Sequence, residues 1–359
     1  MKRICLLLLA ACAAPREWQA ERWPEADALF RQEPRWLGAD AALSIPLGDE
    51  RVLWLFGDSF VATAEPRTRR HSVMVRNSIG VQHGLDPLRA RMTMHWQTDA
   101  DGKPLAFFAP DGEVFFWPGH GQRLSTSGPL VLFLIQVRNT PGLGLGFRAE
   151  GWRIARIAAP DLPPQQWRIE HVTAEPTAFP VCVGTAVVDD GDHVIALAID
   201  EPGSHAGYLA RFAKRALATA DTVAPEWWQD GHWVAQQHLA GRPSVVLQDA
   251  GPECSLHWDR QRGRWLHVMS RGFGATTLAI SEAERLTGPW SAPRDVFTPP
   301  ESHGERPFVY AGKAHPELGD DALVITYATN SFEFRDLFTP AGMEQIYWPR
   351  FVRAQLVGR

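Results

Sequence analysis

Five groups of short apolar strands recur along the chain, and this repeat constrains the fold more than any other feature. Each group is roughly 50 to 70 residues long and has the same rhythm of strands and turns, which is typical of β-propeller blades. From Arg35 onward there is no amphipathic helix of three turns or more. The groups cover residues 40–61 with 72–82, 106–157, 181–212, a stretch from near 233 to 291, and 309–334.

We therefore predict an all-β, five-bladed β-propeller over residues 35–359, with a pair of β-sandwiches as the structural alternative. The last stretch, 347–356, reads as a strand with no blade of its own. We expect this C-terminal strand to complete the first or last blade and close the ring, because an open sheet edge invites aggregation.

The N-terminus resembles a bacterial lipoprotein leader. Two basic residues precede a short apolar run, and the small residues Ala10 and Ala11 stand directly before Cys12. The run is too short to span a membrane. We predict a signal peptide over 1–11, lipidation of Cys12 and a tether over 12–34, with an ordinary cleaved secretory signal as the alternative. The predicted location is the cell envelope, on the outer membrane or its periplasmic side, with membrane contact through the lipid alone.

The composition of the chain bears on its partners and on its cysteines. The net charge of −5 comes without a basic stripe, which argues against nucleic acid. Cys182 and Cys254 are the two cysteines outside the leader, and an oxidising compartment allows a disulfide between them. We favour two separate buried thiols instead, because each lies in an inner strand. We expect a monomer and no cofactor. The run 67–70, rich in Arg, reads as a solvated loop.

Three carboxylates lie where strands begin or end. Asp40 stands between Ala39 and Ala41 at a strand start, and Asp58 closes the next strand in a Gly-Asp-Ser sequence. Glu253 stands at another strand start, in Gly-Pro-Glu-Cys. Flanking small residues allow a ligand to approach, although Asp is also a common turn residue and Glu is usually solvated.

At the level of motifs, the chain resembles five-bladed propeller glycoside hydrolases. The motifs are LGADAALSIPL with LWLFGDS, VRNSIG, PECSLHWDRQRGRWLHVMS with LTGPWSAP, and HPEL with ALVITY. The resemblance is closest to a bacterial family of unknown function that includes endo-acting enzymes on D-arabinan, and more distant to the arabinanase and xylosidase clan. It covers most of residues 35–356, although the Asp-Pro pair usual in that clan is absent at Asp40.

The resemblance implies a catalytic pair, Asp40 and Glu253, with Asp58 as a supporting acid. Apolar neighbours of Glu253 suit a general acid, and an ionised Asp40 suits a base or nucleophile. For substrate contact we select residues near the expected channel mouth, namely Arg76, Asn77, Trp117, His120 and His315. The fifteen tryptophans are compatible with platforms for sugar rings.

No CxxC or HExxH motif is present, so we expect no metal cluster, and no GxSxG motif is present, so we expect no esterase. A single ion bound in the channel is compatible with the sequence. Two classes of function remain. The first is a glycoside hydrolase acting on a furanose-containing polysaccharide or oligosaccharide. The second is a non-catalytic propeller that binds glycan or a partner protein, because fold alone does not fix activity.

Overall fold

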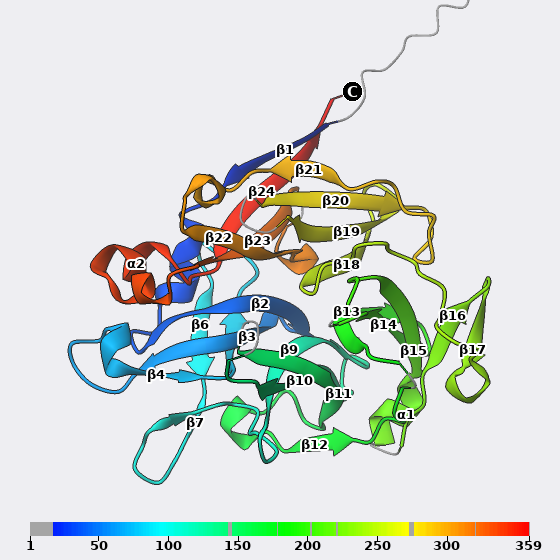
Figure 1. Cartoon of the computed structure of the whole chain (residues 1–359), viewed down its shortest axis with the longest axis horizontal. Coiled ribbons are helices and arrows are strands. Elements are labelled where there is room, and N and C mark those ends of the chain that lie inside the picture. The colour runs from blue at the N-terminus through cyan, green and yellow to red at the C-terminus, as the bar shows by residue number, and fades with distance from the viewer. Residues whose placement is uncertain are drawn as a thin grey trace, which may run out of the picture.

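Five antiparallel sheets follow one another around a ring in the order of the sequence (Figure 1). The structure is a computed structural model that describes residues 17–142, 146–177, 179–201, 203–219, 222–272, 276–319 and 321–358. The predicted all-β, five-bladed propeller is confirmed. The predicted leader 1–11 and the lipidation site Cys12 lie outside the described residues.

Each sheet has an inner strand, and these inner strands contact one another around the ring axis. The inner strands are β2 (Trp36–Gly48), β9 (Val114–Arg123), β13 (Cys182–Asp190), β18 (Cys254–Asp259) and β22 (Pro307–Ala314). The second strands are β3 (Arg51–Ala62), β10 (Leu130–Asn139), β14 (His193–Ile199), β19 (Arg264–Arg271) and β23 (Leu323–Ser331). The third strands are β5 (Ser78–His83), β11 (Phe147–Ile157), β15 (Gly207–Ala213), β20 (Thr277–Ala283) and β24 (Arg350–Val357). The next strands outward are β6 (Arg91–His95), β12 (Ile169–Val172), β16 (Glu226–Gln229), β21 (Arg294–Phe297) and β1 (Glu17–Arg22).

Smaller elements decorate these sheets. Strand β17 (His232–Ala235) adds a fifth strand to the third sheet, so the region near 233 belongs to that blade and not to the fourth. Strand β4 (Ser72–Val75) pairs with β3, and β7 (Gln97–Thr98) pairs with β8 (Pro104–Leu105). The helices α1 (Lys214–Thr219) and α2 (Pro340–Gln345) are short. Among the described residues, no helix has the length and apolar character needed to cross a membrane.

Every pair of neighbouring blades shares a hydrophobic cluster, and these clusters hold the ring together. Phe133 of the second blade packs with Val194 of the third, and Leu209 of the third packs with Met269 of the fourth. The first and last blades share a cluster that contains Trp54 and Phe351. Because blades cover the second strands on both faces, the middle of each of these strands is largely apolar, as in the run Leu130–Leu134 of β10. The ring is therefore closed by packing as well as by pairing.

The two ends of the described chain meet in the last blade. Strand β24 pairs with β23, so the prediction that the C-terminal strand completes a terminal blade is confirmed. Strand β1 then pairs with β24 along its full length, as the outermost strand of that sheet. The predicted tether 12–34 is therefore wrong from residue 17 onward. The sequence of β1, EWQAER, has only one buried side chain, Trp18, and shows little apolar alternation.

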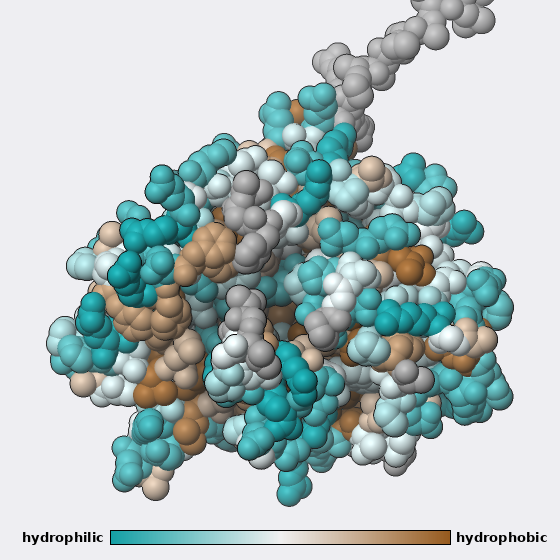
Figure 2. All heavy atoms as spheres, viewed as in Figure 1, coloured by the Kyte–Doolittle hydropathy of each residue, from teal (hydrophilic) through white to brown (hydrophobic). Residues whose placement is uncertain are grey.

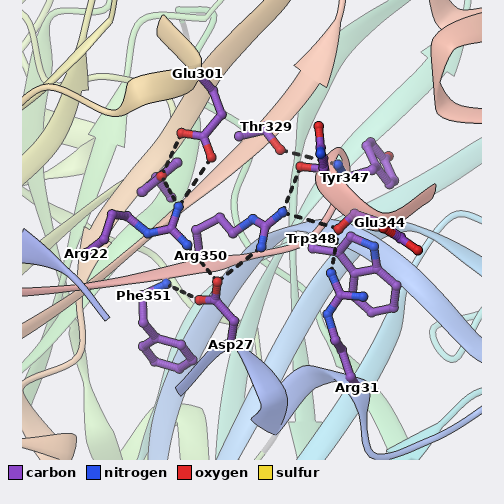
Figure 3. A network of polar contacts seen from close by, with 12 residues as sticks. Arg22, Asp27, Arg31, Glu301, Thr329, Glu344, Tyr347, Trp348, Arg350 and Phe351 are labelled. Carbon is purple, nitrogen blue, oxygen red and sulfur yellow. Dashed lines mark hydrogen bonds and ion pairs between the residues drawn. The ribbon is translucent and has the colours of Figure 1, made fainter. Parts of the chain in front are cut away.

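A buried carboxylate reinforces this closure (Figure 3). Asp27 lies in the 3₁₀ helix η1 (Ala26–Arg31), directly after β1. It accepts hydrogen bonds from Arg22 of β1 at 2.7 Å and from Arg350 of β24 at 3.1 Å. The backbone N–H of Phe351 donates a third at 2.8 Å. One side chain thus joins the two strands that close the ring.

Cys182 and Cys254 are free and buried, which confirms the prediction of separate thiols. Burial raises the pKa of each thiol to about 12. Thiols that hold their proton so firmly are poor nucleophiles, so these residues act as small apolar groups of the core.

Candidate active site

Asp40 lies on an irregular part of β2 that faces the ring axis. The pairing of β2 with β3 shifts on both sides of Asp40, and Ala41 and Ala42 adopt left-handed φ values of 67° and 57°. Left-handed alanines are strained, and such strain is often found at functional sites. Opposite Asp40, a Cβ atom on Gly57 would lie 2.3 Å from Oδ1 of Asp40, so only glycine leaves room there. The backbone of both strands is thus shaped around this carboxyl group.

Two tyrosine hydroxyls donate to the same oxygen of Asp40. The hydroxyl of Tyr310, on β22, lies 2.9 Å from Oδ2, and the hydroxyl of Tyr347 lies 3.3 Å from it. Tyr347 is itself held by a buried arginine, Arg69, which donates to the carbonyl of Ile346 at 2.7 Å. Arg69 is 2% exposed, so the expectation of a solvated loop at 67–70 is wrong for this residue.

Asp58 lies within β3, which continues to Ala62, so the expectation that it closes the strand is wrong. It has a partner on each oxygen. Arg76 donates to Oδ2 at 3.1 Å, and the indole N–H of Trp117, on β9, donates to Oδ1 at 3.1 Å. Trp117 packs edge-on against Phe147 with ring centroids 4.6 Å apart. The structure therefore brings three predicted site residues together, Asp58, Arg76 and Trp117.

Glu253 stands directly before β18 and is paired with a lysine that sequence reasoning missed. Nζ of Lys313 lies 3.8 Å from Oε1 of Glu253, and the Lys313 side chain is 2% exposed while that of Glu253 is 28% exposed. The same ammonium donates to the carbonyl oxygens of Ala41 and Ala311. Lys313 thus connects Glu253 of the fourth blade to the backbone beside Asp40 in the first.

Burial raises the pKa of all three carboxyl groups, and their neighbours act in different directions. For Asp40, burial raises the pKa well above its ordinary value, the charges of Glu253 and Asp58 raise it further, and the two tyrosines oppose the shift. For Asp58, burial raises the pKa, while Arg76 and Trp117 oppose it. For Glu253, burial raises the pKa and Lys313 opposes it. Neighbouring negative charges favour retention of a proton on one of the carboxyl groups.

Three predicted substrate contacts are wrong, because the structure uses these side chains internally. Asn77 is 0% exposed, and its amide group bonds the backbone of Phe108 and Phe116. Both ring nitrogens of His315 bond hydroxyl groups, at 2.6 and 2.7 Å, and the residue is fully buried. His120 bonds the backbone through both nitrogens, so its ring ties inner strands together.

The missed residues differ in how visible they were. Lys313 interrupts the apolar inner strand 307–314, which is a signal of the same kind that selected Asp40. Tyr310 stands on the same strand, but a partly buried tyrosine is common in a sheet and carries no special signal. Tyr347 lies outside the regular strands, with a left-handed φ of 66°, and no sequence pattern marks it.

Other hollows in the molecule lie away from these carboxyl groups. A cavity of about 490 Å³ is lined by residues that include Glu50, Asp86 and Glu317. Glu50 stands in the turn at the opposite end of β2 from Asp40, roughly 25 Å along the strand at the usual rise per residue.

The space-filling view shows a hollow near the middle of the ring (Figure 2). Within the described ranges, no group of three or more His, Cys, Asp or Glu side chains is arranged to hold a metal ion.

Comparisons with known proteins agree with this fold. The chain resembles a solved protein of Bacteroides ovatus proposed to be a hydrolase, with a TM-score of 0.70 and 19% identity over 94% of this chain and 90% of the other. It also resembles the catalytic domain of the Coprinopsis cinerea GH62 α-L-arabinofuranosidase, with a TM-score of 0.52 and 11% identity over 95% and 97% of the two chains. At such identities the likeness shows the fold alone.

No protein of curated function matches the chain. One family model, described as a domain of unknown function, DUF5005, matches residues 25–356. The match spans all five blades, from just after β1 to the end of β24. The chain therefore belongs to the DUF5005 family.

Proposed function

We propose that this protein is a glycoside hydrolase that cleaves a furanose-containing, arabinan-like polysaccharide or oligosaccharide with two carboxyl groups, Asp40 and Glu253. The observation that carries the proposal is that Lys313 contacts both Glu253 of the fourth blade and the backbone beside Asp40 of the first blade, while Asp58 lies on β3, the next strand of the first blade. Hydrolysis of a glycosidic bond needs one carboxyl group that holds a proton and one that is ionised. Burial raises the pKa of all three acids, and neighbouring negative charges favour a proton on one of them.

Glu253 is the proposed general acid. Its side chain is 28% exposed, and its contact with Lys313, at 3.8 Å, is longer than an ordinary hydrogen bond. Its proton passes to the leaving oxygen as the glycosidic bond breaks. Asp40, whose anion the hydroxyls of Tyr310 and Tyr347 stabilise, takes a proton from the attacking water or attacks the anomeric carbon itself. Asp58 remains the supporting acid.

The substrate class rests on two supports. The motifs of this chain resemble those of propeller enzymes that act on arabinan, and one solved structure of the same fold is an α-L-arabinofuranosidase by name. Arg76 and Trp117 lie at the site and are the predicted substrate contacts retained in the proposal. The protein is proposed to act as a monomer.

The test is hydrolysis of arabinans, xylans and 4-nitrophenyl furanosides by the wild type and by the double variant Asp40→Asn/Glu253→Gln. We expect turnover of at least one furanose substrate by the wild type and none above background by the double variant. Turnover that survives in the double variant contradicts the proposed acids. If the wild type turns over no substrate, the hydrolase proposal fails in favour of a propeller that only binds glycan or a partner.

Lys313 supplies a prediction about pH. In the proposed mechanism the alkaline limb of the kcat/KM profile reports the loss of the Glu253 proton. The cation of Lys313 holds the pKa of Glu253 down against burial, so Lys313→Met is expected to raise that pKa and move the alkaline limb to higher pH. Lys313→Arg keeps the charge and is the matched control. A shift of the acid limb instead would assign the proton to Asp40.

We also propose that the mature chain is anchored to the cell envelope by a lipid on Cys12. The basis is the leader sequence alone. When the full-length chain is expressed in a Gram-negative host with radiolabelled palmitate, the wild type is expected to incorporate label and to sediment with the outer membrane. Cys12→Ser is expected to do neither, and equal labelling of the two proteins would contradict the anchor.

A further inference from the structure

Three aromatic rings of the last blade form a row that begins at Asp40. The first is Tyr310, whose hydroxyl donates to Asp40 at 2.9 Å. The ring of Phe308 lies 5.5 Å from that of Tyr310 by centroids, and the ring of Phe332 lies 4.7 Å from that of Phe308. The two pairs are tilted by 37° and 34°, so each ring packs obliquely against the next. We call these three residues the aromatic row.

The aromatic row becomes more exposed as it leaves the carboxyl group. Tyr310 and Phe308 are partly buried, whereas Phe332 is 53% exposed. It stands directly after β23, and its N–H donates to the carbonyl of Arg306, just before β22. These contacts fix its backbone at the end of the blade that also carries Tyr310. A half-exposed ring on an anchored backbone is suited to a binding surface, because little freedom is lost when a ligand covers it.

The ring contacts of a second phenylalanine nearby lead into the core. Phe334 is 51% exposed, but it packs against Phe338 at 5.5 Å and Phe60 at 6.5 Å. Phe60 is 3% exposed, and the path from it to the site runs through Tyr347, which is also 3% exposed. That path is therefore core. Phe332 and Phe334 match in exposure and differ in whether accessible rings lead from them to Asp40.

We propose that the aromatic row is a sugar-binding subsite, which takes a sugar ring of the glycan chain beside the bond that is cleaved. The inference rests on the proposed function and adds where the chain lies, along β22 and the end of β23. The apolar face of a sugar ring stacks on an aromatic ring, while its hydroxyl groups stay in water at the exposed edge. Substrates with a sugar on that side gain from the row, and substrates with only one sugar do not.

The experiment compares Phe332→Ala with its matched control, Phe334→Ala, on arabino-oligosaccharides and on 4-nitrophenyl α-L-arabinofuranoside. Phe332→Ala is expected to raise KM for the oligosaccharides by roughly 2- to 12-fold, which is the size of one stacking contact on an aromatic ring. Its kcat/KM on the nitrophenyl substrate, and both parameters of Phe334→Ala, are expected to stay near those of the wild type. Equal effects of the two variants on the oligosaccharides would overturn the subsite.

Binding without turnover separates this inference from the proposed function. In gels that contain arabinan, the wild type is expected to be retarded, Phe334→Ala to be retarded equally and Phe332→Ala less. This pattern supports the row even if no substrate is hydrolysed, in which case only the hydrolase proposal fails. If arabinan does not retard the wild type, or if it retards Phe332→Ala as much as the wild type, the row is not a sugar subsite.

Discussion

Glu253→Gln is expected to lower kcat/KM on arabinan by about 10²- to 10⁴-fold, the usual contribution of a positioned acid or base. The glutamine keeps the shape of the side chain but has no proton to give to the leaving oxygen. A 4-nitrophenolate leaving group hardly needs that proton, so the same variant is expected to keep most of its activity on a 4-nitrophenyl furanoside. The difference between the two substrates identifies the general acid.

Asp40→Asn is expected to lose a similar factor on both kinds of substrate, because each of them needs the base or nucleophile whatever its leaving group. The matched control is Glu317→Gln, at a partly buried glutamate whose pKa is also raised by burial but which lines the cavity at the other end of β2. It is expected to leave both activities unchanged. Melting temperatures near that of the wild type would show that the losses are chemical.

If Asp40→Asn, and not Glu253→Gln, keeps its activity on the nitrophenyl substrate, the two roles are exchanged. The structure gives that result a physical reason in advance. No ion pair joins Asp40 to a cation among the described residues, although its charge raises the pKa of Lys313. Both neighbouring carboxylates raise the pKa of Asp40, whereas Lys313 favours an ionised Glu253. The tyrosines act in the opposite sense, as donors to the Asp40 anion. The assignment therefore rests on which of these influences prevails once sugar fills the site.

The fold was predictable because each blade repeats short apolar strands separated by turns, and such patterns are visible within a few residues of sequence. A strand between two blades must be apolar on both faces, which gives runs such as LVLFLIQV at 130–137, and each return of the chain needs a turn. Strand β1 was missed because it is an outer strand with one covered face, and its pairing with β24 joins residues more than 300 positions apart. Local patterns carry no information about such a pairing.

For the site, sequence reasoning found the three acids, although Asp40 and Asp58 lie inside β2 and β3 and not at strand ends. It did not find the contacts of the other polar residues. Asn77, His120 and His315 are polar residues in apolar surroundings and were predicted to contact substrate. In the structure each of these side chains forms hydrogen bonds within the protein. A buried polar group must find partners, and the sequence does not show whether protein or ligand supplies them. The same limit hid Lys313, whose partners come from three blades.

Closure of the ring is the part of the fold that depends most on single side chains. The cluster shared by the first and last blades supplies apolar burial, but it does not fix the register of β1 on β24. The carboxylate of Asp27 does so, since it bonds a guanidinium on each strand and the N–H of Phe351 at once. Its side chain is 8% exposed, so water replaces little of what is lost when it is removed.

Asp27→Ala is therefore expected to lower the free energy of unfolding by about 3 to 5 kcal/mol, the range for breaking a buried ion pair while its partner charge remains. Arg350 would then lose its ion pair, Arg22 would keep only its ion pair with Glu301, and the N–H of Phe351 would lose its acceptor. Asp27→Asn, which keeps the size, is expected to be only partly better because a neutral amide does not balance two guanidinium groups. Urea unfolding of wild type and variants measures the difference.

The matched control is Asp295→Ala on β21, which removes an ion pair with Arg271 at 2.8 Å on the surface of another blade. Both of its side chains are nearly half exposed, so solvent screens the pair and the expected loss is about 1 kcal/mol or less. If Asp27→Ala costs no more than this control, the packed cluster between the first and last blades closes the ring unaided. If it costs several times more, the charged contacts of Asp27 hold β1 on β24, and closure of the ring depends on them.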